Sequence, residues 1–319
     1  LPIWYREKSV PAQLYRTLGQ EGWLGFDMKE GALTQHSAFR GSMVSEELAR
    51  VSPGVAVSVL AHVDLGIMGL WLFGSKDLHQ KYGNDALAGR TLMCVGNTES
   101  GAGSDSANIS ARATKVDGGW LLTGAKAYVT NGLVSDLAVV TAVSDPGADR
   151  NNRISMFLVD LGARGVSRRP LNKQVWIPSD LTRIQMEEVF VPDDHLLGQP
   201  GRGLQQILTI FTYSRVYISA LTLGTAVGAF EAALNHAGKR KILGREIIRF
   251  QAKAFEIADL YAKIDAARLV LYRACWRLDR GEDFRMDSSL AKYINVNTAR
   301  EVTQWAADLF GAASVMMDH

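Results

Sequence analysis

The chain has 319 residues, 47% of them hydrophobic and 21% charged, so it can bury a large core and does not have the composition of a disordered protein. Its 35 Lys and Arg against 33 Asp and Glu leave a net charge of +2, which argues against a protein built around nucleic acid. Two cysteines exclude a disulfide framework and a thiolate metal cluster. They fit a reducing compartment, the cytoplasm, or the mitochondrial matrix in a eukaryote.

The first segment, residues 1–88, is expected to form a helical domain. Ser45–Arg50 predicts one helix face, and Pro53-Gly54 breaks it. No charged region followed by an apolar run opens the chain at Leu1, so no signal peptide is expected. Both ends are expected to have been trimmed from a longer protein.

The apolar stretch Val55–Gly74 has about the length of a membrane span. His62 and Asp64 lie in its middle, and an Asp at mid-bilayer costs about 2.5–3.5 kcal/mol. A buried core helix is therefore expected, and no membrane span.

Residues 89–200 change to a period of two and predict a compact antiparallel β domain. Apolar and polar residues alternate over Ile109–Thr114, Asp117-Gly118-Gly119 predicts a hairpin turn, and Trp120 starts the returning strand. Further strands are expected at Leu137–Thr141, Ile154–Val159 and Thr182–Phe190.

Residues 201–319 return to the helical period and predict a helical bundle. One helix carries an apolar seam at alternating spacings of three and four, and Gly281 ends it. The seam consists of Ile257, Leu260, Ile264, Ala267, Leu271, Ala274 and Leu278. The order of helices, then strands, then helices gives an α+β fold class and argues against a doubly wound parallel sheet.

Several common sites are absent. No two of the six histidines have metal-ligand spacing, so no metal site is expected. Gly119–Ala127 imitates a phosphate-binding loop, but its Lys is displaced by one place and it lies on a hairpin strand. Gly101-Ala102-Gly103 lacks the third glycine and the following helix of a dinucleotide fingerprint.

Three segments offer binding chemistry, each weak alone. In Thr98–Asp105, two glycines and two hydroxyls could let a ligand approach the backbone, although an ordinary turn between strands is the favoured interpretation of the string taken alone. Tyr128 and Thr130 share one face of a strand, where a ring could stack and a hydroxyl could bond. Lys241, Arg245, Arg249 and Lys253 step by four and form one stripe if the helix is continuous, and most of them are expected to be a solvated face. Gly244 suggests a break, and Arg240 before it could bind a diphosphate.

Together these segments resemble the acyl-CoA dehydrogenase family. Residues 98–105 are similar to its T-E-P-G-x-G-S-D loop, and residues 124–132 to its N-G-x-K-x-W-I-T-N-G strand. Val189-x-Val191-Pro192 matches the end of the family's β domain, and Arg240 to Gln251 matches R-x-x-F-G-x-x-I-x-x-F-Q. The order and separations match over nearly the whole chain.

The resemblance implies an N-terminal helical domain, a middle antiparallel β-barrel and a C-terminal four-helix bundle, in dimers or homotetramers with non-covalent FAD. The residues that it assigns to FAD are Thr98, Gly103, Ser104, Tyr128, Thr130, Arg240, Gln251 and Gly311. Arg240 and Gln251 would reach the FAD of a neighbouring subunit, Arg240 at its diphosphate. Ser104 and Arg215 would lie at the substrate cavity.

The chain departs from the family pattern at several positions. Tyr128 replaces Trp and keeps an aromatic face, while Ser100 replaces Pro and Leu243 replaces Phe. The Q-x-x-G-G loop appears as Asp308 to Ala312, and an Asp there would repel phosphate. The family's catalytic Glu would follow His319, and the alternative position before Arg215 holds Ser214.

The reaction implied is α,β-dehydrogenation of an acyl thioester on CoA or a carrier protein, with hydride transfer to FAD N5. An electron-transfer flavoprotein or O₂ would then accept the electrons. Two alternatives stay open: a flavin monooxygenase or oxidase on the same fold, and a non-catalytic flavin-fold interaction subunit.

Overall fold

The computed structural model describes residues 2–316, which divide into two compact units. One unit contains the residues up to His36 together with Val57–Ser214, and the other contains Ser37–Ala56 together with the residues from Arg215 onward. Boundaries at residues 88 and 200 between three domains stay a prediction.

The first segment is mostly helical, as expected, but it also contains a β-hairpin that the sequence analysis missed. The hairpin joins β1 (Phe26–Lys29) and β2 (Ala32–Gln35), and Glu30 and Gly31 both have positive φ in its turn. The helices around it are α1 (Pro2–Glu7), α2 (Ala12–Gln20), α3 (Ala38–Val51), α4 (Pro53–Leu60), α5 (Met68–Phe73) and α6 (Lys76–Leu87).

The apolar stretch is a helix, in which a π-helical stretch, Ala61–Ile67, joins α4 to α5. His62 and Asp64 are both buried in this stretch. By length and composition, Pro53–Phe73 and Gly203–Lys239 could each cross a membrane, but buried core helices pass the same test, and 78% of the first window is buried.

The middle domain is an open, mixed sheet, so the expected closed antiparallel barrel is wrong in two respects. The strands run in the order β10-β7-β6-β4-β5-β9-β8, with β3 also paired to β6. Both β3 and β4 pair with β6 in parallel. Parallel neighbours need a long connection between them, and β5 lies between β4 and β6 in the chain, while the segment before β4, β4 and β5 all lie between β3 and β6. The strands are β3 (Met93–Gly96), β4 (Arg112–Val116), β5 (Gly119–Thr130), β6 (Leu137–Val143), β7 (Ile154–Asp160), β8 (Val166–Pro170), β9 (Leu181–Pro192) and β10 (Leu196–Leu197).

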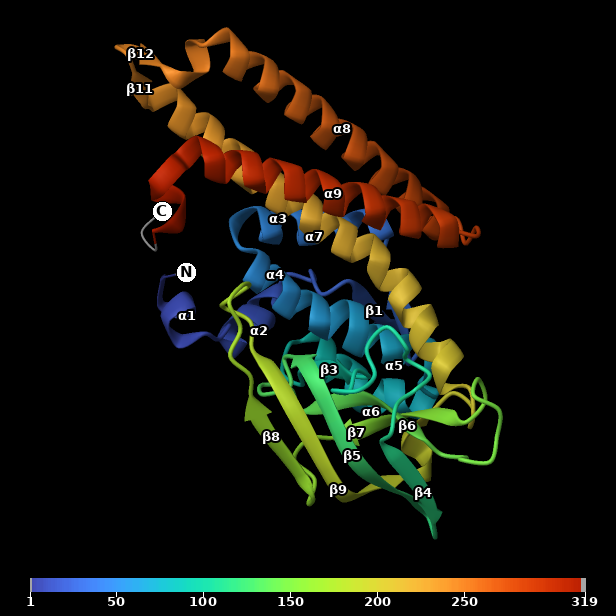
Figure 1. Ribbon diagram of the computed structural model, residues 1–319. Helices are drawn as coiled ribbons and strands as arrows, with labels where there is room; N and C mark the ends of the chain where they lie inside the picture. The colour runs from blue at the N-terminus through green and yellow to red at the C-terminus, as the bar shows by residue number, and fades with distance from the viewer. Residues whose placement is uncertain (1, 317–319) are drawn as a thin grey trace. The chain divides into compact units, whose positions relative to one another are not determined.

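The C-terminal segment forms long helices: α7 (Gly203–Lys239), α8 (Gln251–Asp279) and α9 (Arg285–Phe310). The predicted seam on α8, a long orange helix in Figure 1, is confirmed, since five of its residues are buried. The helix ends before Gly281. The helices of the second unit also include α3, whose Ala38 N–H and Ser37 hydroxyl donate to Asp279 of α8. The helices of the C-terminal segment therefore form one unit with α3, which comes from the first segment of the chain.

The prediction of a continuous cationic stripe on one helix is wrong. The helix ends at Lys239, and Lys241–Ile242 (β11) pairs with Arg245–Glu246 (β12) as a small hairpin. Leu243 and Gly244 have positive φ in its turn, so the break expected at Gly244 is confirmed.

Candidate functional site

The loop after β3 turns tightly where the sequence has its glycines. Glu99 and Ala102 exchange backbone hydrogen bonds of 3.0 and 3.1 Å, which closes the turn around Ser100 and Gly101. A Cβ added at Gly101 or Gly103 would meet no heavy atom within 4 Å. The packing of the chain itself therefore does not require these glycines, and they leave the loop surface open to a ligand.

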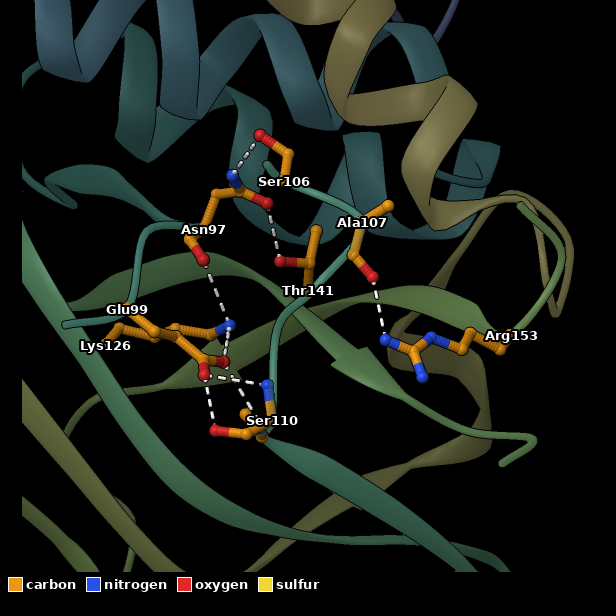
Figure 2. Close-up of polar contacts among 9 residues, drawn as sticks. Asn97, Glu99, Ser106, Ala107, Ser110, Lys126, Thr141 and Arg153 are labelled. Carbon is orange, nitrogen blue, oxygen red and sulfur yellow. Dashed lines mark hydrogen bonds and ion pairs between the residues drawn. The ribbon is translucent and has the colours of Figure 1, made fainter. Parts of the chain in front are cut away.

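A buried ion pair ties this loop to β5 (Figure 2). The Lys126 ammonium, with no exposed surface, lies 2.8 Å from a Glu99 carboxylate oxygen and donates to the Asn97 carbonyl at 3.1 Å. Glu99 also accepts hydrogen bonds from the Ser110 N–H and hydroxyl and from the Ala111 N–H. Every strong acceptor position of the carboxylate is thus used inside the protein.

The pair stays charged near neutral pH. Burial alone would raise the pKa of Glu99, but the Lys126 charge and the hydrogen bonds outweigh it and lower that pKa. Burial lowers the pKa of Lys126 to about 8, although Glu99 opposes the change. Glu99 is therefore a structural anchor of the loop and is not available as a catalytic base.

Asn97 fixes the other side of the loop. Its carboxamide oxygen accepts from the Thr141 hydroxyl of β6 at 2.8 Å, while the Ala127 N–H donates to the Thr98 carbonyl at 2.8 Å (the first bond is drawn in Figure 2). The loop is thus bonded to both β5 and β6.

A β-bulge on β5 turns Tyr128 to the surface. Lys126 pairs with Ile184 and Val129 with Thr182, so two residues of β5 stand opposite one residue of β9. Tyr128 has a φ of 57°, in the left-handed region, and 62% of it is exposed. The bulge reverses the alternation, so Lys126 is buried while Tyr128 and Thr130 face one cleft.

This cleft, of about 140 Å³, brings together three of the predicted FAD residues: Thr98, Tyr128 and Thr130. Sequence reasoning missed its other lining residues, Leu65, Val95, Asn97, Ala127 and Phe211. They come from the π-helix, β3, the loop that follows it, β5 and α7, and only Ala127 lies within a motif, at a position that the motif leaves open. The lining combines an exposed aromatic ring, two hydroxyls, a carboxamide and apolar walls, which fits one face of a flat heteroaromatic ring.

The other predicted site residues lie elsewhere. Gly103 and Ser104 are exposed on the loop but do not line the cleft. In the second unit, Arg215 is half-buried on α7, Arg240 and Gln251 are exposed on either side of the β11–β12 hairpin, and Gly311 follows α9 with positive φ.

No group of three or more His, Cys, Asp or Glu residues within 2–316 is placed to hold a metal ion.

Family models of the N-terminal, middle and C-terminal domains of acyl-CoA dehydrogenases match residues 2–90, 94–189 and 201–319. A probable acyl-CoA dehydrogenase of Mycobacterium tuberculosis, FadE25, is 37% identical over 279 residues, covering 86% of this chain and 71% of that protein. The chain belongs to the acyl-CoA dehydrogenase family. It is thus an oxidoreductase of a family that uses FAD, and the family supports acyl-CoA dehydrogenation as its activity.

Solved structures agree with this assignment. Butyryl-CoA dehydrogenase from Megasphaera elsdenii is 26% identical, with a TM-score of 0.92 over 98% of this chain and 83% of that one. An FAD complex of PigA is also 26% identical, with a TM-score of 0.91 over 98% and 82% of the two chains. A structure described as an electron transferring flavoprotein of Acidaminococcus fermentans is 28% identical, with a TM-score of 0.94 over 98% and 83%.

Proposed function

We propose that this acyl-CoA dehydrogenase family member removes the α and β hydrogens of an acyl thioester carried by CoA or a carrier protein. The observation that carries the proposal is the convergence of Thr98, Tyr128 and Thr130, from two separate motifs, on one cleft. When FAD is bound, its N5 atom supplies the acceptor for the β-hydrogen, which leaves as hydride.

The residues of the cleft would hold and shield the flavin ring. The Tyr128 ring would offer a stacking face and the Thr130 hydroxyl a hydrogen bond, and the Thr98 hydroxyl would lie beside them. Gly103 and Ser104, further along the same loop, would contact the cofactor outside the cleft. Leu65 and Phe211 make the cleft wall apolar and would exclude water.

Substrate contacts are proposed for Ser104 and Arg215. The catalytic base is not assigned, because none of the described residues that line the cleft carries a carboxylate.

The diphosphate tail of FAD is proposed to bind the second unit of an adjoining protomer. Arg240 is exposed, and within residues 2–316 its guanidinium has no ion pair, so an external phosphate could pair with it. Gln251 and Gly311 would contribute further contacts, whereas Asp308 disfavours phosphate beside it.

A homo-oligomer is also proposed, because α8 and α9 expose an apolar surface that a second copy could cover. The exposed residues that form it include Phe255, Leu269, Trp276, Met286 and Tyr293.

After the dehydrogenation, electrons would pass to an external acceptor, for which a separate electron-transfer flavoprotein is our first candidate. We also propose a cytoplasmic location.

The first test mixes the FAD-loaded protein anaerobically with a panel of CoA and carrier-protein thioesters and follows the flavin absorbance. Bleaching by a saturated thioester, with formation of the enoyl product, is expected. Rapid reaction of the chemically reduced flavin with O₂ and no bleaching by any thioester would favour the oxidase alternative. A protein that takes up no FAD would favour the non-catalytic subunit.

The second test is Arg240→Ala, with Arg280→Ala as an exposed-cation control at the other end of α8. A charge-assisted hydrogen bond is worth about 1.5–3 kcal/mol, so FAD affinity should fall roughly ten- to a hundredfold in the first variant only. Equal FAD affinity in both variants would make Arg240 part of a solvated surface.

A further inference from the structure

Positive charge is concentrated on one part of the sheet. Residues 164–185, which contain β8 and the start of β9, carry five basic side chains and a single acidic one, in a chain whose total net charge is only +2. The basic residues are Arg164, Arg168, Arg169, Lys173 and Arg183, and the acidic residue is Asp180.

Two of these arginines lie in a row with the exposed tyrosine of the cleft. Arg169 of β8 is the direct partner of Arg183 of β9 in the ladder. On the other side of β9, Arg183 lies opposite the bulge that contains Tyr128. Neighbouring strands are about 4.7–4.9 Å apart, so Tyr128, Arg183 and Arg169 cross three adjacent strands in one short row. All three are exposed, and they define what we call the basic row.

The two arginines of the basic row repel each other, and no contact of their side chains within residues 2–316 offsets this repulsion. Like charges directly opposite each other on neighbouring strands are destabilising. Neither Arg169 nor Arg183 has an ion pair or a side-chain hydrogen bond among residues 2–316. Edge strands use charge to prevent aggregation, which explains Arg169, but Arg183 lies on β9, which is paired on both sides.

The only acid in the segment does not neutralise the basic row. Asp180 accepts hydrogen bonds from the Leu133 N–H and the Thr182 hydroxyl. Its second carboxylate oxygen is buried without a partner, and burial raises the pKa of the group. Asp180 therefore does not neutralise Arg169 or Arg183, and their charge is available to a molecule outside the chain.

We propose that the basic row is the docking surface for an acidic protein that accepts electrons from the reduced cofactor. The inference rests on the proposed function, because it requires flavin in the cleft beside Tyr128. The reduced cofactor, when bound, would give up two electrons in succession, one to each of two acceptor molecules, and the released protons would pass to solvent. Electron transfer slows steeply with distance, so an acceptor must dock close to the cleft.

A surface of exposed guanidinium groups suits such a partner. Complementary charge speeds the encounter with a protein partner and orients it. Exposed guanidinium groups can do this at a distance, before any contact forms between the two proteins. A small phosphate ligand is the competing occupant. It is disfavoured because both arginines are exposed on a pleated face and neither lines the cleft.

The test measures how fast the holoenzyme passes electrons to two one-electron acceptors of opposite charge. The FAD-loaded protein is photoreduced anaerobically, without any thioester, and mixed with acidic plastocyanin or with basic cytochrome c. The variant is Arg169→Gln/Arg183→Gln, and the control is Arg112→Gln, an exposed arginine opposite Thr123 on the same sheet.

The double variant should react about tenfold more slowly with plastocyanin at low ionic strength and faster with cytochrome c, and high salt should abolish both differences. The control should resemble the wild type. Unchanged rates, or equal changes with the control, would overturn the proposal. A loss of FAD affinity in the double variant would also overturn it, by assigning the arginines to the cofactor phosphates. Because reduction uses no thioester, failure of the dehydrogenation proposal would be visible separately.

Discussion

Acid should destabilise the unit that carries the cleft through one buried histidine, His62. Its Nδ1 lies 3.1 Å from the Met93 N–H, which can only donate, so Nδ1 must accept. Its Nε2 lies 3.1 Å from the Ala86 carbonyl oxygen, so Nε2 carries the proton and donates. The ring is therefore neutral in the fold, and it bridges two backbone groups.

Burial lowers the pKa of His62 from 6.5 to about 4. Because the folded pKa lies below the unfolded one, protons bind the unfolded chain more tightly. The contribution of His62 to stability is complete above pH 6.5 and is lost as the pH falls toward 4. At about 1.36 kcal/mol per pKa unit the full loss is about 3 kcal/mol, of which about 2 kcal/mol is gone by pH 5.

The assay is urea unfolding of the wild type and of His62→Gln at pH 7, 6 and 5. Glutamine offers one acceptor and one donor but does not titrate in this range. The wild type should lose about 2 kcal/mol relative to the variant between pH 7 and 5. The comparison cancels Asp64, whose pKa burial raises and whose effect on stability has the opposite sign.

Equal pH dependence in the two proteins would refute this reasoning. It would mean that water or a rearranged backbone accommodates the charged imidazole. The cleft should respond as well, because Met93 begins the strand that supplies Val95, and Leu65 lies in the same π-helix as His62. FAD release from the wild type should therefore increase below pH 6 more than from the variant.

Three further substitutions should separate fold from site. Lys126→Met leaves the Glu99 carboxylate buried and unpaired, so the unfolding free energy should fall by about 3–5 kcal/mol, and the double variant Glu99→Gln/Lys126→Met should lose less in the same denaturation curves. Asp279→Ala removes the acceptor at the start of α3 and should cost about 1 kcal/mol in thermal unfolding, whereas Asp265→Ala on the exposed side of α8 should be neutral. Tyr128→Gly should relieve left-handed backbone strain and so raise the stability of the FAD-free protein by about 1 kcal/mol, while lowering its FAD affinity. Tyr128→Phe keeps both the ring and the strain, so it should change the stability and the FAD affinity little. A Gly variant that retains full FAD affinity would contradict the stacking role.

The local signals in the sequence determined much of the architecture, because each depends on neighbouring residues alone. The apolar seam of α8, the hairpin turn at Gly118 and the return of β5 follow from periodicity and from glycine conformation. The four linked motifs were specific enough to indicate the family, since their order and spacing cannot all arise from turns and solvated faces. The π-helical stretch and β1–β2 had no comparable local signal.

Only the tertiary structure decided how the cleft is built. The Glu99–Lys126 pair joins residues 27 positions apart, and Leu65 and Phe211 reach the cleft from helices that no motif marks. The outward turn of Tyr128 depends on a bulge, which arises from the register between β5 and β9 and which the residue types of neither strand signal in the sequence. The basic row depends on the same register, because Arg169 and Arg183 become neighbours only when β8 and β9 pair. Contacts of this kind follow from how strands align in space, and that alignment is a property of the whole sheet.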